Sequence, residues 1–336
     1  MHIHFSLRTL LWVVFSALLL PSCKKPNNNT TPKINDPIVD PVVVNTDKSN
    51  LKRLFASFDT APQYYTVITG TEVNITGEKG TRIRFYDSSF KDSAGNYLLN
   101  DTLNVTMTEI YTPGDMIANG IVATTGNDKL LTSRGQAYLK VTRKGKEVFA
   151  NRFGIDFWQS APSAQKTAIH YGTAANADSL VNWTMVDTVR YIGNTAANTL
   201  FDSAFGSFYV FDSCPRFNWL SCGYPISSSN AVTNINITVP DTTFNPSNTR
   251  LFIYFPDMKS LHAFKYFDAA TRTFNLGTSA SWIPINWNAT LVIMASKNGQ
   301  FYYYEQKKIT TALGQSFTPS ILPQSATYIA DKLKGL

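Results

Sequence analysis

The sequence predicts an all-β protein with two antiparallel β-sandwich domains and a short C-terminal helix. The composition favours strands, because 22 Phe, 16 Tyr and 6 Trp accompany a charged fraction of only 16%, and aromatic residues suit extended structure. Several segments alternate apolar with polar residues, which is typical of strands with one buried face. Turn residues recur at intervals of about ten positions, the spacing expected of short antiparallel strands.

The first 22 residues predict a secretory leader. Arg8 is the only full charge ahead of the apolar run Thr9–Leu20, and a basic start before a short apolar core is the pattern of a signal peptide. That run is too short for a transmembrane helix, which needs about 20 apolar residues. The ending Leu20-Pro21-Ser22-Cys23 resembles a bacterial lipobox, which implies cleavage before Cys23 and lipidation of its thiol. The alternative is an ordinary cleaved signal with an incidental cysteine.

We interpret residues 23–50 as the lipidated Cys23 followed by a flexible tether. The segment is rich in Asn, Pro, Thr and Asp and has no helical period. As a flexible coil it would reach about 28–30 Å, enough to hold a folded part clear of a bilayer. Together with the leader, the tether predicts an outer membrane lipoprotein at the cell surface or periplasmic face.

Residues 51–160 predict the first sandwich. The clearest strand is Thr102–Ile110, which alternates over its whole length. The sequence Arg143-Lys144-Gly145-Lys146 predicts a hairpin turn between two further strands. The residues expected to share one face of the clearest strand are Leu103, Val105, Met107 and Glu109.

Several short stretches resemble a known group of proteins. They are Gly80–Phe85, Ser89–Gly95, Val105-x-Met107-x-Glu109, Asp115-Met116, and Leu130-Leu131 before Gly135. This pattern resembles a ZU5-like β-sandwich domain of envelope lipoproteins from Bacteroidetes-type bacteria. The later Phe217-Asn-Trp219-Leu-Ser-Cys222 resembles the C-terminal region of the same proteins, although Ser221 and Gly223 replace their usual Asn and Asp. The resemblance implies an uncharacterised envelope lipoprotein and no established activity.

Residues 161–336 predict the second sandwich. The polar segment 161–199 indicates a linker, with a first strand at Val181–Val186. The strands that follow are Ser207–Phe211, Asn234–Val239, Arg250–Phe255, Ala263–Phe267, Leu291–Ala295 and Gln300–Glu305. Asn298-Gly299 predicts a tight hairpin. The only predicted helix is Ser325–Leu333, with Ser325 as N-cap.

The sequence contains no recognisable catalytic motif, and we predict no catalytic residues, no cofactor and no metal. The histidines that follow the leader, His170 and His262, are far apart in sequence. A zinc site with the two later cysteines is disfavoured by the cysteine spacing. Asp87, Asp92 and Asn96 offer oxygens of the kind that calcium binds, but ordinary turn chemistry explains them better.

Two questions about side chains stay open. Cys214 and Cys222 form either a disulfide, which would stabilise the fold by roughly 2–3 kcal/mol, or two buried thiols. The aromatic residues are either core filling or a binding patch. The candidates for such a patch are Trp158, Trp183, Trp219, Trp282, Trp287 and Tyr302–Tyr304. We select Trp282, Trp287 and Tyr303, because a Trp-rich loop is hard to bury and consecutive tyrosines on a strand face both sides.

The sequence therefore predicts a lipid-anchored extracytoplasmic binding or structural module of the bacterial envelope. Its expected partners are the membrane, through the lipid, and a carbohydrate or another envelope protein. Nucleic acid is excluded, because the net charge of +7 is spread over short runs beside turns rather than one basic face. The alternative is an envelope-anchored hydrolase that acts on glycans through a carboxylate pair.

Overall fold

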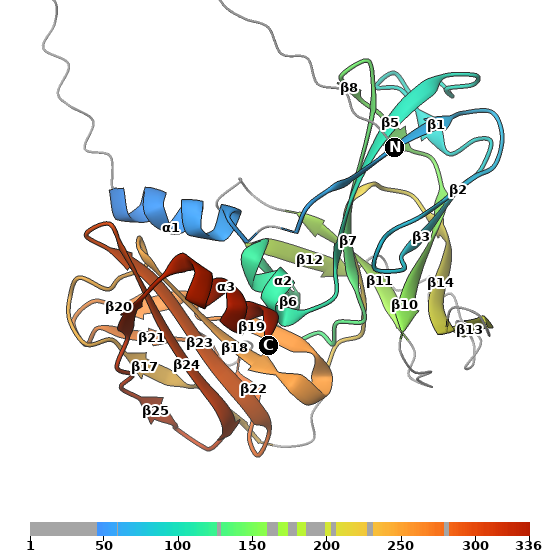
Figure 1. The fold of residues 1–336 in the computed structure, drawn as a ribbon. Coiled ribbons are helices and arrows are strands. Elements are labelled where there is room, and N and C mark those ends of the chain that lie inside the picture. The colour runs from blue at the N-terminus through green and yellow to red at the C-terminus, as the bar shows by residue number, and fades with distance from the viewer. Residues whose placement is uncertain are drawn as a thin grey trace, which may run out of the picture. The chain divides into compact units, whose positions relative to one another are not determined.

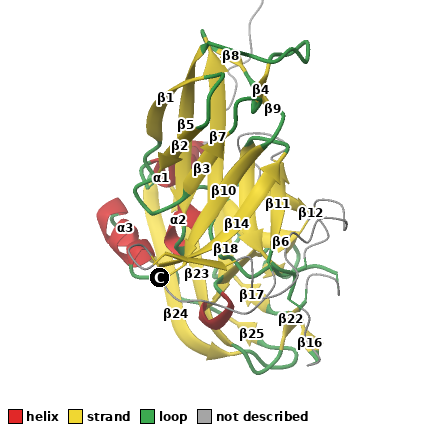
Figure 2. Ribbon diagram, turned by 90° about the vertical axis from the view of Figure 1, so that its right-hand side faces the viewer, coloured by secondary structure: helices red, strands yellow, loops and turns green. Residues whose placement is uncertain are grey.

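The structure is a computed structural model that describes residues 46–58, 60–125, 129–159, 167–173, 180–185, 199–202, 206–226, 231–278 and 282–336. The predicted leader, Cys23 and nearly all of the tether lie outside these residues. The predicted all-β class is confirmed, because the described chain consists mainly of strands in antiparallel sheets with three short α-helices (Figures 1 and 2).

Two sheets form the first sandwich. Sheet 1 has the order β1 (Gln63–Ile68), β5 (Thr102–Ile110), β7 (Gln136–Arg143), β15 (Asn218–Gly223), β11 (Ala168–Thr173), β12 (Val181–Met185) and β6 (Ile121–Thr125), with β8 (Lys146–Glu147) beside β7. Sheet 2 has the order β13 (Thr199–Asp202), β14 (Gly206–Cys214), β10 (Phe153–Gln159), β3 (Arg82–Phe85) and β2 (Val73–Thr76). Only β12 and β6 pair in parallel in these two sheets. A separate short pair joins β4 (Phe90–Lys91) to β9 (Phe149–Ala150).

The core of this sandwich is formed by alternate residues of both sheets. β5 has the bounds that the sequence predicted, and Leu103, Val105, Met107 and Glu109 are all buried. The three apolar members join one core cluster with Ile83 of β3 and other residues of sheet 2. The β7–β8 turn at Arg143–Lys146 also forms where it was predicted.

The sheets do not divide at residue 160, where the two domains were predicted to meet. β10 lies before that position and pairs with β14 beyond it, and β15 pairs with both β7 and β11. The segment 161–199 therefore contributes β11 and β12 to sheet 1, instead of serving only as a linker. The first sandwich therefore extends to Gly223, where β15 ends. Its later strands pair with the earlier ones and so satisfy their backbone hydrogen-bonding groups.

Two further sheets form the second sandwich. Sheet 3 has the order β19 (Ser260–Ala263), β18 (Thr249–Phe255), β23 (Asn288–Lys297), β24 (Gln300–Thr310) and β26 (Leu322–Gln324). Sheet 4 has the order β20 (Tyr266–Asp268), β21 (Thr273–Asn275), β17 (Asn236–Thr238) and β25 (Ser316–Phe317). β16 (Val232–Thr233) pairs with β22 (Ile283–Pro284), and a 3-10 turn covers Pro256–Met258.

The central strands of sheet 3, β18 and β23, are buried on both faces. One face shares a core with sheet 4, to which Ile253 and Ile293 contribute. The other face packs against three helices and β6, and Phe252 and Met294 belong to that core. This explains why β18 and β23 are apolar almost without interruption, because a strand covered on both faces has no solvent side.

The three helices cover the second face of sheet 3 and belong to one core cluster with it (Figure 1). They are α1 (Thr46–Ala56), α2 (Pro113–Ala118) and α3 (Ala326–Lys334). α1 begins inside the segment predicted as tether, because Leu51 and Leu54 lie one turn apart and are both buried. α3 and its N-cap Ser325, which accepts a hydrogen bond from the Tyr328 amide, confirm the predicted helix.

The hairpin at Asn298-Gly299 is confirmed between β23 and β24. Lys297 and Gln300 are paired across the turn. Asn298 and Gly299 have φ values of 53° and 75°, the left-handed backbone that a two-residue hairpin of this kind requires.

A buried polar row crosses sheet 1 on the face away from its sandwich core. His170 on β11 is opposite Ser221 on β15, and Ser221 is opposite Gln136 on β7. The exposed fractions of these residues are 0%, 1% and 0%. Burial lowers the pKa of His170 from its ordinary value of 6.5.

We predict that the free energy of unfolding falls between pH 7 and pH 5 because of His170, whose pKa is lowered in the folded protein. The unfolded chain takes up the proton more readily than the folded one, so stability is complete above pH 6.5 and is lost as the pH falls. Urea unfolding at both pH values measures this. The slope should disappear in His170→Gln and persist in the matched Ser221→Ala variant; an unchanged slope in His170→Gln would contradict the assignment.

Candidate functional site

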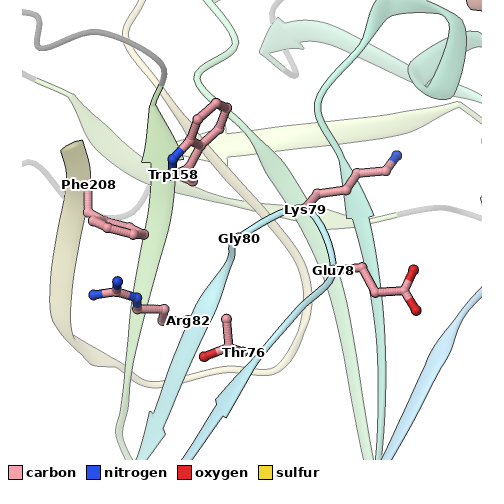
Figure 3. Close-up of a pocket in the computed structure, with 7 residues that line it drawn as sticks. All are labelled: Thr76, Glu78, Lys79, Gly80, Arg82, Trp158 and Phe208. Carbon is pink, nitrogen blue, oxygen red and sulfur yellow. The ribbon is translucent and has the colours of Figure 1, made fainter. Parts of the chain in front are cut away.

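A cleft in the described chain lies at the end of sheet 2, beside the turn that joins β2 to β3. Its volume is about 680 Å³, and it opens widely to solvent. Figure 3 shows the residues around it, which come from β2, β3, β10, β14 and the turn. They are Thr76, Glu78, Lys79, Gly80, Arg82, Trp158 and Phe208.

The turn is fixed from inside the protein by Glu109. One carboxylate oxygen, Oε2, accepts hydrogen bonds from the Lys79 amide and from the Gln63 side chain, each at 2.8 Å. The other, Oε1, accepts from the Thr81 amide at 2.8 Å. The side chain is fully buried, and a buried carboxylate is tolerated only when its oxygens are hydrogen-bonded. The turn is therefore held by charge-assisted bonds rather than by its own backbone alone.

Two glycines allow this close approach. A Cβ on Gly77 would lie 2.3 Å from Glu109 Oε2, so any side chain there would displace the carboxylate. Gly80 has φ +94°, and a Cβ there would lie 3.1 Å from the Cβ of Trp158. The turn thus packs directly against the tryptophan.

Trp158 and Phe208 reach the cleft because they lie on the outer face of sheet 2. Phe157 points into the sandwich core, so its neighbour Trp158 must point outward, where it is half-buried. Phe208 is opposite Trp158 in the strand pairing. Arg82, on the same face, places its guanidinium carbon 3.9 Å from the centre of the Phe208 ring.

The charged residues of the turn point away from this aromatic group. In Figure 3, Glu78 and Lys79 extend on the opposite side of the turn from Trp158, Phe208 and Arg82. Lys79 Nζ forms an ion pair of 2.8 Å with Asp115 Oδ2. On the side of the turn where Trp158 and Phe208 lie, the polar side chains of the lining are those of Arg82 and Thr76.

Asp115 connects the turn to α2 and to a second cavity, of about 460 Å³, bordered by α2 and α3. It closes a capping box with Thr112 at the start of α2 and accepts a hydrogen bond from Thr60 at 3.2 Å. Burial opposes its ionisation, but the hydrogen bond and charge of Lys79 outweigh burial and hold the pKa of Asp115 below its ordinary value. The ion pair of Lys79 with Asp115 therefore links the β2–β3 turn to α2.

Two carboxylates share one arginine further along the outer face of sheet 2. The Arg84 guanidinium lies 2.9 Å from an oxygen of Asp156 and 2.9 Å from an oxygen of Asp212. Burial raises the pKa of Asp156, and the charge of Arg84 offsets only part of that effect. Neither carboxylate lines the cleft.

The structure does not bring the three selected aromatics together. Trp282 is 36% exposed, and its indole donates a hydrogen bond to the Gly277 carbonyl at 3.2 Å. Trp287 is half-buried against Phe255 in the core between sheets 3 and 4. Tyr303 is only 4% exposed and belongs to the core on the other face of sheet 3. These residues do not form a shared binding patch.

Cys214 and Cys222 are buried free thiols, the second of the two alternatives. Cys214 lies beside Tyr171 and Cys222 beside Thr167. Burial raises the pKa of Cys214 to about 12, so this thiol is poorly reactive.

The other predicted polar groups have structural roles. Asp92 accepts hydrogen bonds from the Ala94 and Asn96 amides, each at 2.9 Å, as in an ordinary Asx turn. His170 and His262 lie in different sheets. Among the residues that the structure describes, there is no group of three His, Cys, Asp or Glu side chains that could hold a metal ion.

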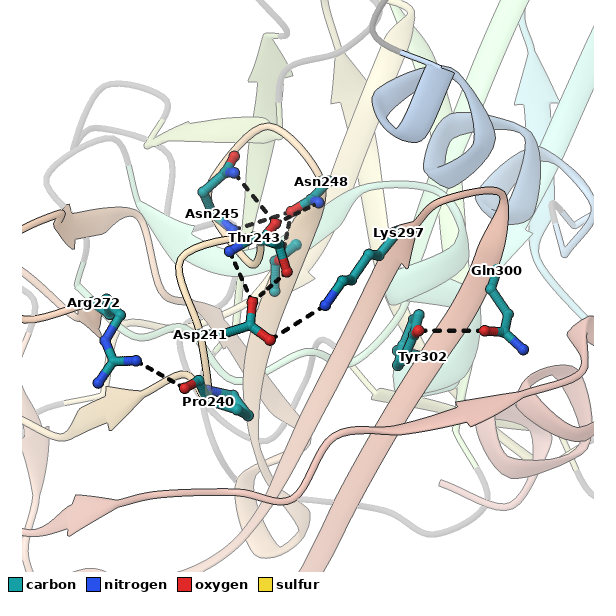
Figure 4. Close-up of polar contacts among 10 residues, drawn as sticks. Pro240, Asp241, Thr243, Asn245, Asn248, Arg272, Lys297, Gln300 and Tyr302 are labelled. Carbon is teal, nitrogen blue, oxygen red and sulfur yellow. Dashed lines mark hydrogen bonds and ion pairs between the residues drawn. The ribbon is translucent and has the colours of Figure 1, made fainter.

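A second polar cluster surrounds Asp241, next to the β23–β24 hairpin (Figure 4). Asp241 accepts hydrogen bonds from the Thr243 amide at 2.8 Å and from its hydroxyl, and it pairs with Lys297 at 3.3 Å. These hydrogen bonds, with that from Thr243 the largest, hold the pKa of Asp241 below its ordinary value. Asn248 accepts from the Asn245 amide and donates to the Thr243 carbonyl. The cluster closes a loop and leaves no converging set of groups for a ligand.

Sequence reasoning considered Trp158 among the aromatics but did not select it, and it missed Arg82, Gly80 and Phe208. One signal was available, because two adjacent aromatics on an alternating strand, Phe157 and Trp158, must face opposite sides. No local pattern indicated that β14, which carries Phe208, pairs with β10. The two strands are far apart in the chain.

No protein-family model matches this chain, and a search of curated proteins also gave no match. In the described part of the chain, no helix is long and apolar enough to cross a membrane.

We predict that Glu109→Gln lowers the free energy of unfolding by about 2–4 kcal/mol, because one backbone amide of the turn would then face an NH₂ group instead of an acceptor. Urea unfolding measures the change. Glu147→Gln removes the same charge from an exposed position of β8 and should change stability by less than about 0.5 kcal/mol. Equal effects of the two substitutions would contradict the role of Glu109.

Proposed function

We propose that this chain is a lipid-anchored binding module of the bacterial envelope, attached through Cys23 to the outer membrane at its cell-surface or periplasmic face. The observation that carries the proposal is the leader, whose apolar run ends in Leu20-Pro21-Ser22-Cys23. A polar tether follows it. Several acyl chains on one cysteine would provide stable attachment, whereas a single chain binds membranes only marginally.

The cleft beside the β2–β3 turn supports the binding part of the proposal. Its walls come from β2, β3, β10 and β14, and buried hydrogen bonds to Glu109 fix the turn before any ligand arrives. A preorganised site loses less conformational entropy when it binds. Phe208 is only 2% exposed, so the half-buried Trp158 is the aromatic residue of the cleft that reaches solvent. A partly exposed indole suits a carbohydrate ring better than it suits a small apolar ligand.

The resemblance to ZU5-like domains of Bacteroidetes-type envelope lipoproteins is consistent with this proposal. A β-sandwich that contains Gly80–Phe85 and Val105–Glu109 is the architecture that the resemblance implied. Sandwiches of this kind serve many functions, so the resemblance suggests a setting in the envelope rather than an activity.

An envelope-anchored glycan hydrolase is the alternative, and one observation favours it. Because Asp156 and Asp212 contact the same nitrogen of Arg84, their contacting oxygens lie within about 6 Å, the range of a retaining glycosidase pair. However, Asp156 is only 6% exposed, and Arg84 occupies the position between the two carboxylates. The binding module is therefore the better supported proposal.

We predict that Cys23→Ala moves the protein from the membrane pellet to the soluble envelope fraction. The parent chain and the variant are expressed in a Gram-negative host, fed labelled palmitate, fractionated and compared by immunoblot. Lys24→Ala is the matched control, because it changes the neighbouring residue and keeps the thiol. A Cys23→Ala protein that sediments with membranes as completely as the parent would contradict the anchor.

A further inference from the structure

The outer face of sheet 4 carries a row of uncharged polar side chains. Strand pairing places Tyr266 of β20 opposite Asn275 of β21, and Asn275 opposite Asn236 of β17. Asn236 is in turn opposite Ser316 of β25. Ile237, the next residue along β17, is fully buried in the core between sheets 3 and 4. Because successive side chains of a strand point to opposite faces, the row faces away from that core.

Tyr266 places an exposed aromatic ring at one end of the row. The residue is 44% exposed. A Cβ on Gly277 would overlap the Tyr266 ring, so the ring lies directly on the glycine backbone. The Gly277 carbonyl also accepts the hydrogen bond from the indole of Trp282, which is 36% exposed. Two partly exposed aromatic side chains are therefore fixed at one glycine, whose φ of +94° favours a residue without a side chain.

The amides of Asn275 and Asn236 keep hydrogen-bonding groups for a ligand. Asn275 Oδ1 accepts a hydrogen bond from the Gly277 amide at 2.8 Å, which directs the NH₂ group away from that glycine. Within the described part of the chain, no residue accepts from this NH₂ group, and none is hydrogen-bonded to the Asn236 side chain. In the adjacent row, by contrast, the hydroxyls of Thr238 and Thr273 are hydrogen-bonded to each other at 3.1 Å. A side-chain amide can donate to a hydroxyl group and accept from one.

An open hollow of about 350 Å³ lies beside Tyr266. The described residues that line it are Tyr266, Phe267, Asp268, Asn275, Gly277 and Thr278. Asp268 is the only charged residue among them, and its two oxygens accept hydrogen bonds from the Ala270 amide and the Thr271 hydroxyl. An anionic ligand would therefore meet a carboxylate and no cation in this lining, which disfavours it.

These features together suit a chain of neutral sugars. A partly exposed tyrosine ring offers an apolar face to the C–H groups of a sugar while the sugar hydroxyls stay hydrated. A small apolar ligand would need an enclosed pocket, and a protein partner would need an apolar centre, whereas the centre of this face holds two amides. Neighbouring strands lie about 4.8 Å apart, so the row of four residues is about 14 Å long, close to the length of a trisaccharide.

We propose that the outer face of sheet 4 binds a neutral oligosaccharide that crosses the strands, with one sugar ring on Tyr266 and hydroxyl groups on the amides of Asn275 and Asn236. The site belongs to the second sandwich and shares no lining residue with the cleft beside the β2–β3 turn. The inference goes beyond the proposed function, because it depends neither on that cleft nor on the lipid anchor.

The test uses the purified full chain in a detergent without a sugar headgroup. Binding of cellotriose, xylotriose, mannotriose and maltotriose is measured one at a time by calorimetry, and trigalacturonate is the acidic comparison. At least one neutral trisaccharide should bind, and trigalacturonate should bind more weakly. Tyr266→Ala should weaken binding of the neutral ligand about tenfold, whereas Tyr266→Phe keeps the ring and should retain most of the affinity.

Asn236→Ala tests the site even if Tyr266→Ala fails to fold. The Asn236 side chain makes no hydrogen bond to another described residue, so the variant should be as stable as the parent and bind about threefold more weakly. The matched controls are Tyr64→Ala and Asn104→Ala, which remove an exposed tyrosine and an exposed asparagine from sheet 1. Both should bind the neutral ligand as the parent does.

Several results would overturn the inference. They are no binding of any of the four neutral trisaccharides, stronger binding of trigalacturonate, unchanged binding in Asn236→Ala and in a folded Tyr266→Ala, or an equal loss in the controls. Loss of binding in Trp158→Ala with unchanged binding in Tyr266→Ala would assign the saccharide to the cleft, which overturns this inference and leaves the proposed function standing. The lipid anchor is judged separately, by fractionation of Cys23→Ala.

Discussion

The buried carboxylate of Glu109 is the interaction on which the cleft depends. It brings a negative charge into the core of the first sandwich, which would be costly without partners. The partners are two amides of the β2–β3 turn and the side chain of Gln63. The carboxylate accepts the hydrogen bonds that the turn amides must make, which holds the turn in one conformation. This conformation places Gly80 against Trp158. The same turn reaches α2 through Lys79 and Asp115.

A second constraint is that sheet 3 is covered on both faces. Its outer face is buried by α1, α2, α3 and strands of sheet 1, and residues of both sandwiches belong to that core. Trp183 of β12 is fully buried there and donates a hydrogen bond to the Val122 carbonyl. α3 is held by Tyr328, whose ring meets Tyr303 edge-on, with the ring centres 6.1 Å apart. Residues of both sandwiches therefore belong to one shared hydrophobic core cluster.

Local patterns predicted much of the fold. The alternation of Thr102–Ile110, the Asn298-Gly299 turn and the Ser325 N-cap each depend on neighbours in sequence, and each was confirmed. The extent of the first sandwich was not predicted, because the pairing of β10 with β14 joins segments about 50 residues apart and has no local signal. α2 is short, and its available clues were the capping box of Thr112 and Asp115 and the proline at its first position.

The candidate site was harder to predict for the same reason. Alternation could place Trp158 outside the core, but it could not show that Arg82 and Phe208 would lie beside it. The selected Tyr303 is buried because α3 covers its face of β24, a contact between segments with no shared pattern. Glu109 was correctly expected on the same face as Leu103, Val105 and Met107, but its partners in the turn became evident only from the structure.

Native-state hydrogen exchange of the Thr81 amide tests the central claim most directly. This amide donates to the buried Glu109 at 2.8 Å, and the amide of the exposed Ala94 donates to Asp92 at 2.9 Å, so the two bonds differ mainly in burial. The account predicts that the Thr81 amide exchanges as slowly as the amides paired between β5 and β7, while the Ala94 amide exchanges rapidly. If the Thr81 amide exchanged as fast as that of Ala94, Glu109 would not hold the turn, and the cleft would not be preformed.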